Sequence, residues 1–280
     1  HDVFQIAPRK DAVAVVAVVL LHIEILFGSG GAPLFSIERG KGDHENACQI
    51  MHTSFSMLTL CSILLMLIGL IFAKPILTLF GADRENLGYA CPYLMIYLLG
   101  TFPSMVATGM NPFINAQGYA TTGMISVVIG AVANLILDPI FIFAFGMGIR
   151  GAALATGLGQ VFTLLIYLFV YVFRPISVKI GRRYLHTEDY LTGKLYAIGI
   201  PAILNMALPS LLTTALNAIL STYSQIYVVI LGIYYKLQTF LYLPANGLIQ
   251  GMRPIIGYNY GAGEKTRVKK IYHTTLALNS

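Results

Sequence analysis

Charged residues are scarce in this sequence. Only 11% of its 280 residues are Asp, Glu, Lys or Arg, and 56% are hydrophobic, whereas a soluble domain carries about 25% charged residues. The mean hydropathy of +0.73 agrees with this composition. A soluble globule needs a polar surface, so an ordinary cytosolic enzyme, a secreted disulfide scaffold and a disordered chain are all excluded. The net charge of +6 does not indicate nucleic-acid binding, because the basic residues form short clusters between long apolar runs.

Motifs for catalysis and for cofactor binding are also lacking. The three cysteines, Cys48, Cys61 and Cys91, show no CxxC spacing, and we interpret them as small residues of the apolar interior. The sequence contains no GxSxG, no HExxH and no paired Asp-rich motif. The segment 261–266 resembles a phosphate-binding loop, but Glu264 stands where that motif needs its lysine. We therefore expect neither an enzyme nor a cofactor.

Long apolar segments dominate what remains. A bilayer core of about 30 Å needs about 20 apolar helical residues, and alternation of period two is absent, which favours helices over barrel strands. The sequence therefore predicts an all-α membrane protein, a polytopic helix bundle in contact with the lipid bilayer. An eighth apolar segment starts near Ile271. The seven segments that qualify as spans are 12–37, 50–72, 89–112, 122–146, 151–173, 196–220 and 226–250.

The basic residues predict the orientation of these spans. Cytoplasmic loops carry an excess of Lys and Arg, and twelve of the 18 basic residues fall on one side of the predicted topology. The long basic loop 174–194 is expected to be a cytoplasmic linker. The twelve are Arg39, Lys41, Arg174, Lys179, Arg182, Arg183, Lys194, Arg253, Lys265, Arg267, Lys269 and Lys270; the other side has Arg9, Lys10, Lys74, Arg84 and Arg150.

An internal repeat relates two parts of the chain. At a constant offset of 221, four residues of segment 30–43 are identical to their counterparts in segment 251–264. Both copies end a span on the predicted cytoplasmic side, and a parallel repeat of this kind is typical of transporters. We expect an N-lobe over 1–173 that lacks its first helix, the linker 174–194, and the start of a C-lobe over 195–280. The identical pairs are Gly30 and Gly251, Pro33 and Pro254, Gly40 and Gly261, and Gly42 and Gly263.

Three motifs in the middle of the chain resemble a known transporter family. They are NPFINAQG at 111–118, GAVANLILDP at 130–139 and GIRGAALAT at 148–156, and the segments 28–42 and 251–263 resemble paired loops. The chain is similar to the MATE family of multidrug and toxin extrusion transporters. The resemblance implies twelve helices in two six-helix lobes around a central cavity. It also implies export of small organic cations across the bacterial plasma membrane, by a monomer, in exchange for H⁺ or Na⁺.

Relative to that family, the chain lacks the first helix and the last four. A carboxylate that family members carry on the first helix is missing with it. The sequence is therefore expected to be a fragment. A truncated protein without transport activity is one alternative to the antiporter, and a lipid-linked oligosaccharide flippase of related fold is another. A flippase would carry several cations within its spans, whereas here Lys236 stands alone.

Two polar residues on the fourth span suggest an ion site. Asn134 and Asp138 are four residues apart, so they share one helix face, and a charge within a span is costly unless paired or hydrated. Pro139 frees the carbonyl of Leu135, so an amide, a carboxylate and a carbonyl within one turn would suit a proton or Na⁺. Alternatively, Asp138 caps a break at Pro139 and Asn134 bonds a neighbouring helix. The family resemblance assigns Asn134, Asp138 and Thr156 to the cation-binding cluster of the N-lobe.

Four further residues are candidates for a substrate cavity. Lys236 lies about ten residues into its span, too deep to reach the interface easily, so we expect it to face a cavity. Gln238 and Tyr234 lie beside it, and the tyrosine ring would attract a cation. Glu24, in the first span, poses the same choice between a side chain that faces the cavity and one that reaches toward the interface.

Overall fold

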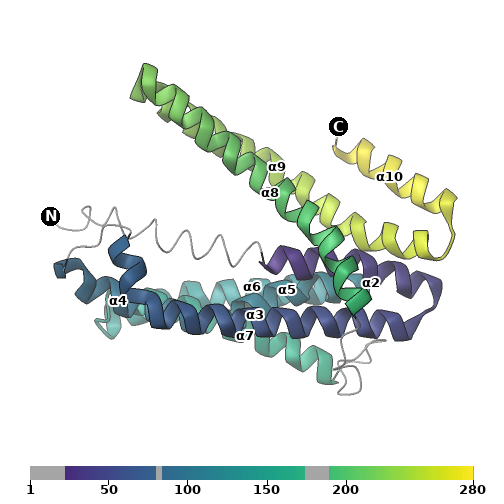
Figure 1. The fold of residues 1–280 in the computed structure, drawn as a ribbon, viewed down its shortest axis with the longest axis horizontal. Helices are drawn as coiled ribbons and strands as arrows, with labels where there is room; N and C mark the ends of the chain where they lie inside the picture. Colours follow the sequence, from purple (N-terminus) through teal and green to yellow (C-terminus); the bar gives the residue numbers. More distant parts are fainter. Residues whose placement is uncertain (1–22, 80–83, 174–188, 280) are drawn as a thin grey trace.

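The structure is a computed structural model that describes residues 23–79, 84–173 and 189–279. Every regular element among them is helical, which confirms the expected all-α membrane fold (Figure 1). The elements are η2 (Ile25–Ser29), α2 (Gly30–Lys41), α3 (His44–Leu79), α4 (Arg84–Leu99), α5 (Thr101–Ala116), α6 (Ala120–Pro139), η3 (Ile140–Ala144), α7 (Ile149–Phe173), α8 (Asp189–Tyr223), α9 (Gln225–Gly261) and α10 (Lys265–Asn279).

Five of the described helices are long and apolar enough to cross a membrane, and a sixth span results if α4 and α5 are counted as one. The first expected span, 12–37, lies largely outside the described residues. Of the expected linker, 174–188 also lies outside them, while 189–194 belong to α8. The five spans are His44–Ile71 in α3, Ala120–Ala144 in α6 and η3, Ile149–Phe173 in α7, Gly193–Tyr223 in α8 and Gln225–Gly261 in α9.

The third expected span, 89–112, is bent, contrary to the expectation of one helix. α4 and α5 meet at Gly100 with a bend of 41°. Pro103 explains the position, because it has no N–H to donate to the carbonyl of Leu99, four residues earlier. A Cβ on Gly100 would lie 3.1 Å from the Cα of Gly157, so the bend fits closely against α7.

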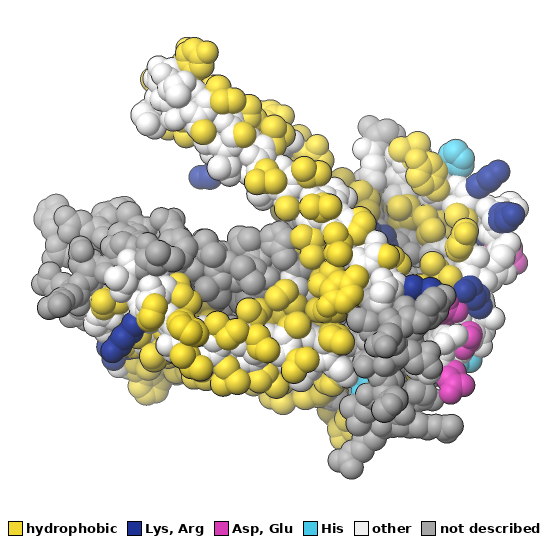
Figure 2. Space-filling view, viewed as in Figure 1, with side chains coloured by type: hydrophobic (Ala, Val, Ile, Leu, Met, Phe, Trp, Pro, Cys, Tyr) yellow, Lys and Arg dark blue, Asp and Glu magenta, His cyan; other side chains and the backbone are white. Residues whose placement is uncertain are grey.

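The helices α2 to α7 pack into one bundle. Its main core contains Phe35 and Phe113, which meet edge-to-face with ring centroids 5.5 Å apart. Large apolar side chains remain exposed on the outer faces of α3, α6 and α7, and Figure 2 shows such side chains along the flank of the bundle. An apolar outer surface of this extent suits lipid contact.

The helices α8 and α9 rise away from the bundle, and only their lower parts pack on it (Figure 1). The contact between α2 and α9 joins the two copies of the sequence repeat. A Cβ on Gly40 would overlap the carbonyl oxygen of Tyr258, and a Cβ on Gly261 would overlap that of Ile37. Both pairs are related by the same offset of 221, so the contact is reciprocal, as two-fold symmetry requires. The repeat is therefore also a local symmetry of the structure.

Candidate functional site

The candidate ion site lies where α6 and α7 cross. The two helices are joined by the short turn 145–148 and run antiparallel. A Cβ on Gly130 would lie 2.8 Å from the carbonyl oxygen of Gly159, and a Cβ on Gly159 would lie 2.8 Å from that of Gly130. Small residues at this crossing therefore bring the two backbones close together.

The crossing places Asn134 opposite Thr156. Asn134 lies one turn after Gly130 on α6, and Thr156 lies one turn before Gly159 on α7, so antiparallel helices bring them together. The Asn134 Nδ2 donates a hydrogen bond to Thr156 Oγ1 at 3.3 Å. Thr156 Oγ1 donates in turn to the carbonyl oxygen of Ala152 at 2.9 Å. Asn134 therefore bonds a neighbouring helix, as the structural alternative for this residue expects, and it does so through the amide N–H rather than the amide oxygen.

Asp138 lies one turn beyond Asn134 on the same face of α6. Its side chain is half-buried, and its Oδ1 is buried without a hydrogen-bond partner among the described residues. A carboxylate oxygen in this position is unfavourable within a membrane unless a cation, a proton or water satisfies it. The described residues also contain no cluster of three His, Cys, Asp or Glu side chains.

The expected break at Pro139 is a change of helix type. α6 ends at Pro139 and passes directly into the π-helix η3, so both form one span. The wider π turn is a common response to an interrupted hydrogen-bond ladder and is frequent at functional sites. Asp138 therefore stands at the junction of the two helix types and does not cap a chain break.

The three cavity candidates of α9 lie apart from this cluster. Tyr234 is 56% exposed, Lys236 is exposed and Gln238 is half-buried. The described contacts of α9 are with α2, α5, α8 and α10, and its far part rises away from the bundle (Figure 1). The structure therefore does not bring these three side chains to Asn134, and their role in a cavity stays a prediction.

Glu24, by contrast, lies inside the packed bundle. It is 9% exposed and immediately precedes the π-helix η2. The side chain is close enough to Tyr97 on α4 for an electrostatic interaction. Tyr97 also lines a pocket that Thr156 borders from the other side. Glu24 therefore belongs to the same region of the bundle as the candidate ion site.

Sequence reasoning missed the residues that surround this pocket. Thr101, Ser104 and Gln160 contribute two hydroxyls and an amide from α5 and α7. Polar residues within predicted spans were the available signal, but their relative positions depend on the bend at Gly100.

Comparison with known proteins places this geometry in a family. A model of the family MatE matches residues 11–140 and 201–280, three quarters of the chain. The multidrug export protein MepA of Staphylococcus saprophyticus is 27% identical over 253 residues, which cover 90% of this chain and 56% of that protein. MepA of Staphylococcus haemolyticus is 28% identical over 251 residues, which cover 90% of this chain and 55% of that protein. The chain spans about half the length of these curated relatives.

Solved structures show the same fold. A crystal structure of MATE in complex with MaD3S superposes with a TM-score of 0.89 at 22% identity, over 97% of this chain and 62% of that chain. A multidrug resistance MATE family transporter of the MOP superfamily, in an outward-facing conformation, gives a TM-score of 0.84 at 22% identity. The match covers 96% of this chain and 60% of that chain. Together with the apolar helices, these findings confirm a multi-pass protein of the plasma membrane.

Proposed function

Because this chain belongs to the MATE family of membrane transporters, we propose that it forms part of an exporter of small organic cations. The exporter exchanges its substrate for H⁺ or Na⁺ and uses no cofactor and no chemical step. The similarity to MepA proteins, which are named for multidrug export, supports this direction of transport. The proposed partners are the lipid bilayer and cationic drugs, and the proposed state is a monomer.

One observation carries the coupling mechanism: Asp138 Oδ1 is buried, has no hydrogen-bond partner within the described part of the chain, and lies one turn from the Asn134–Thr156 hydrogen bond. A proton or Na⁺ that binds there neutralises the carboxylate. Loss of this charge lowers the affinity for a cationic substrate, and the substrate leaves on the outer side. Exchange is driven because the ion and the substrate differ in affinity for the two states of the site. Return of the charge on the inner side completes the cycle.

The rest of the site supports this role. The amide oxygen of Asn134 is free to accept a cation from the face that it shares with Asp138, while the N–H side holds Thr156. The η3 turn after Pro139 allows the end of the span to rearrange when the charge changes. On α9, Tyr234 would meet an organic cation by its ring face, and Gln238, four residues later, shares that helix face. Lys236 is two residues from both and lies on the other side of α9.

The substitution Asp138→Asn tests the mechanism. It makes the neutral form permanent, so in a transporter of full family length that contains this chain it should abolish ion-driven efflux. Insertion and expression should be unchanged. Asn134→Ala removes one neutral ligand and should weaken efflux about 2- to 12-fold, the factor that corresponds to one hydrogen bond. The measurement is efflux of a fluorescent cation from vesicles energised by a proton gradient or by a sodium gradient.

A matched control is Asp43→Asn, the same chemical change in the exposed turn between α2 and α3. It should pump at the wild-type rate, because asparagine replaces aspartate well as a helix cap. If Asp138→Asn also pumps at that rate, the fourth-span site is structural. The coupling group would then be sought at Glu24, the buried carboxylate beside Tyr97.

A further inference from the structure

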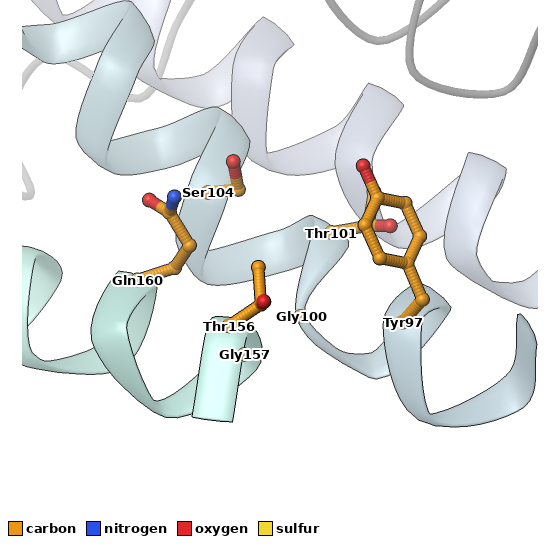
Figure 3. A pocket seen from close by; sticks show the side chains of 7 residues that line it. All are labelled: Tyr97, Gly100, Thr101, Ser104, Thr156, Gly157 and Gln160. Atoms are coloured by element: carbon orange, nitrogen blue, oxygen red, sulfur yellow. The ribbon is translucent and has the colours of Figure 1, made fainter. Parts of the chain in front are cut away.

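Outside the candidate ion site and the pocket beside it (Figure 3), the described residues carry their densest group of like charges at the start of α10. Four of the six residues from 265 to 270 are basic, and all four are exposed. Figure 2 shows basic side chains gathered at the end of the molecule where α10 starts. We call these four residues the basic cluster: Lys265, Arg267, Lys269 and Lys270.

The basic cluster has too little negative charge around it. None of its four side chains forms an ion pair or a hydrogen bond with another described residue, whereas Lys41 on α2 pairs with Glu38 at 2.9 Å. The turn before α10 offers one acidic residue, Glu264, against four positive charges. The first turn of α10 contains no acidic residue, although a helix N-terminus favours negative charge and disfavours positive charge. An anionic partner would therefore stabilise this end of the helix.

The internal repeat shows that the fold does not require these charges. The turns before α3 and α10 have the same backbone hydrogen bonds at the offset of 221, and Gly42 and Gly263 have φ angles of 82° and 78°. The counterparts of the basic cluster at the start of α3 contain no Lys or Arg. They are His44, Asn46, Cys48 and Gln49. Because the same local structure forms without the cations, the positive charge of α10 serves another purpose.

The apolar residues of α10 place the basic cluster at a membrane surface. Val268, Ile271 and Thr275 are half-buried, and their spacing of three and four residues forms the face that packs on α9. Leu276 is 56% exposed and lies about 9 Å beyond Lys270 along the helix. The headgroup layer of a bilayer is about 5–8 Å thick on each side. With Leu276 in the hydrocarbon, the basic cluster therefore lies among the headgroups.

We propose that the basic cluster binds an anionic phospholipid. The lipid belongs to the leaflet that the start of α10 faces, which the excess of basic residues predicts to be the cytoplasmic one. The negatively charged headgroup pairs with the ammonium and guanidinium groups of the cluster, and the acyl chains lie beside Leu276. A zwitterionic lipid carries no net charge and is not held in this way. The inference adds a partner to the proposed exporter and does not depend on transport.

Native mass spectrometry of the detergent-solubilised protein, at full family length, measures the affinity. Phosphatidylglycerol should bind with a Kd at least about tenfold lower than phosphatidylcholine with the same acyl chains. Lys265→Gln together with Lys269→Gln should raise the Kd for phosphatidylglycerol at least about tenfold, since each basic residue near an anionic surface contributes about fivefold. The matched control removes two exposed cations at the opposite end, Lys74→Gln with Arg150→Gln, and should leave this Kd unchanged.

Equal Kd values for the two phospholipids, or for the wild type and the Gln pair at 265 and 269, would overturn the proposal. Lys265→Arg with Lys269→Arg keeps the charge and should bind the lipid as the wild type does. A loss as large as that of the Gln pair would show altered helix packing and would also overturn it. Glycerol phosphate carries the phosphate without acyl chains, and an excess of it should not displace the lipid. Displacement would assign the cluster to soluble phosphates and refute the lipid.

Fluorescence quenching in vesicles tests where the lipid binds. In a cysteine-free background, Thr266→Cys in the basic cluster carries a small fluorophore, and the matched control is Glu45→Cys, its counterpart on α3 at the offset of 221. Both positions are exposed. The vesicles are phosphatidylcholine with a minor fraction of nitroxide-labelled phosphatidylglycerol or nitroxide-labelled phosphatidylcholine.

The ratio of quenching by the labelled anionic lipid to quenching by the labelled zwitterionic lipid corrects for the depth of each fluorophore. This ratio should be at least about twofold higher at 266 than at 45, because the anionic lipid is enriched beside the cations. Loss of the Glu45 charge makes its surroundings less repulsive to anionic lipid, so the control works against the expected difference. Equal ratios at the two positions would refute a lipid site at the start of α10, whether or not the protein exports drugs.

Discussion

At the scale of single residues, Asp43 shows how one side chain fixes a helix start. It accepts hydrogen bonds from the backbone N–H of Asn46 at 3.0 Å and from the Asn46 amide at 2.6 Å. The first of these bonds is the main reason why the pKa of the Asp43 carboxyl is below its ordinary value. The ionised form of Asp43 is therefore the form that caps α3.

This depressed pKa predicts how the start of α3 responds to acid. The cap contributes in full above the unfolded pKa, about 3.9, and the contribution is lost as the pH falls through the lower pKa of the folded state. Exchange protection of the first turn of α3, corrected for intrinsic rates, should therefore fall in acid. Hydrogen-exchange mass spectrometry of the detergent-solubilised protein measures this. Asp43→Asn retains the cap without the titration, and an equal acid response in that variant would contradict the prediction.

At the scale of elements, the contact between α2 and α9 depends on glycine at matched positions. Gly40 and Gly261 each face a carbonyl oxygen of the other helix, and a Cβ would overlap it. Arg39 strengthens the same contact, since its guanidinium lies 5.9 Å from the ring centroid of Tyr258 and Nη1 donates to the carbonyl oxygen of Ala116 at 2.7 Å. The side chain therefore joins α9 to the end of α5.

Substitution of these glycines should separate the two helices. Gly261→Ala should lower the melting temperature of the purified protein, because the new Cβ forces a shift of backbone against backbone. Gly247→Ala is the matched control on α9, since no atom lies within 4 Å of its added Cβ, and better helix propensity should leave it unchanged or slightly more stable. The measurement is thermal unfolding in detergent. A Gly261→Ala protein as stable as Gly247→Ala would show that the contact is looser than described.

The elements also show where sequence reasoning succeeds. Hydropathy located α6, α7, α8 and α9, because an apolar run of this length in lipid must satisfy its backbone as a helix. It missed the bend at Gly100, because an average over a window does not register one glycine followed by Pro103. The Asn134 and Asp138 pair was predictable from its spacing of four. The exposure of Tyr234 was not, since it depends on which helices pack against α9.

At the scale of the whole molecule, the structure places the two copies of the repeat at the same end. The last turns of α2 and α9 cross, so Arg39 and Lys41 share an end with the basic start of α10. Most of the charged side chains visible in Figure 2 gather at one end. The excess of basic residues predicts that this end faces the cytoplasm. Because the two copies of the repeat cross here, both must lie on the same side of the membrane.

Cysteine labelling tests this orientation. In a cysteine-free background, His44→Cys at the start of α3 should react with a membrane-impermeant thiol reagent only after cells are broken. Met147→Cys, in the turn between η3 and α7 at the opposite end, should react in intact cells. Both positions are at least partly exposed, so access through the membrane decides the result. Labelling of position 44 in intact cells would reverse the topology.

The amino-acid sequence by itself determined the class of molecule, the approximate spans, the repeat and the polar residues of the fourth span. These features are local, because apolar length and backbone hydrogen bonding decide helix formation in a membrane. The tertiary structure decided which faces meet. The Asn134–Thr156 bond, the pocket beside Thr101 and the crossing of Gly40 with Gly261 all arise where small residues let helices approach. Such approaches depend on the complementary shapes of segments far apart in the chain, which no single segment specifies.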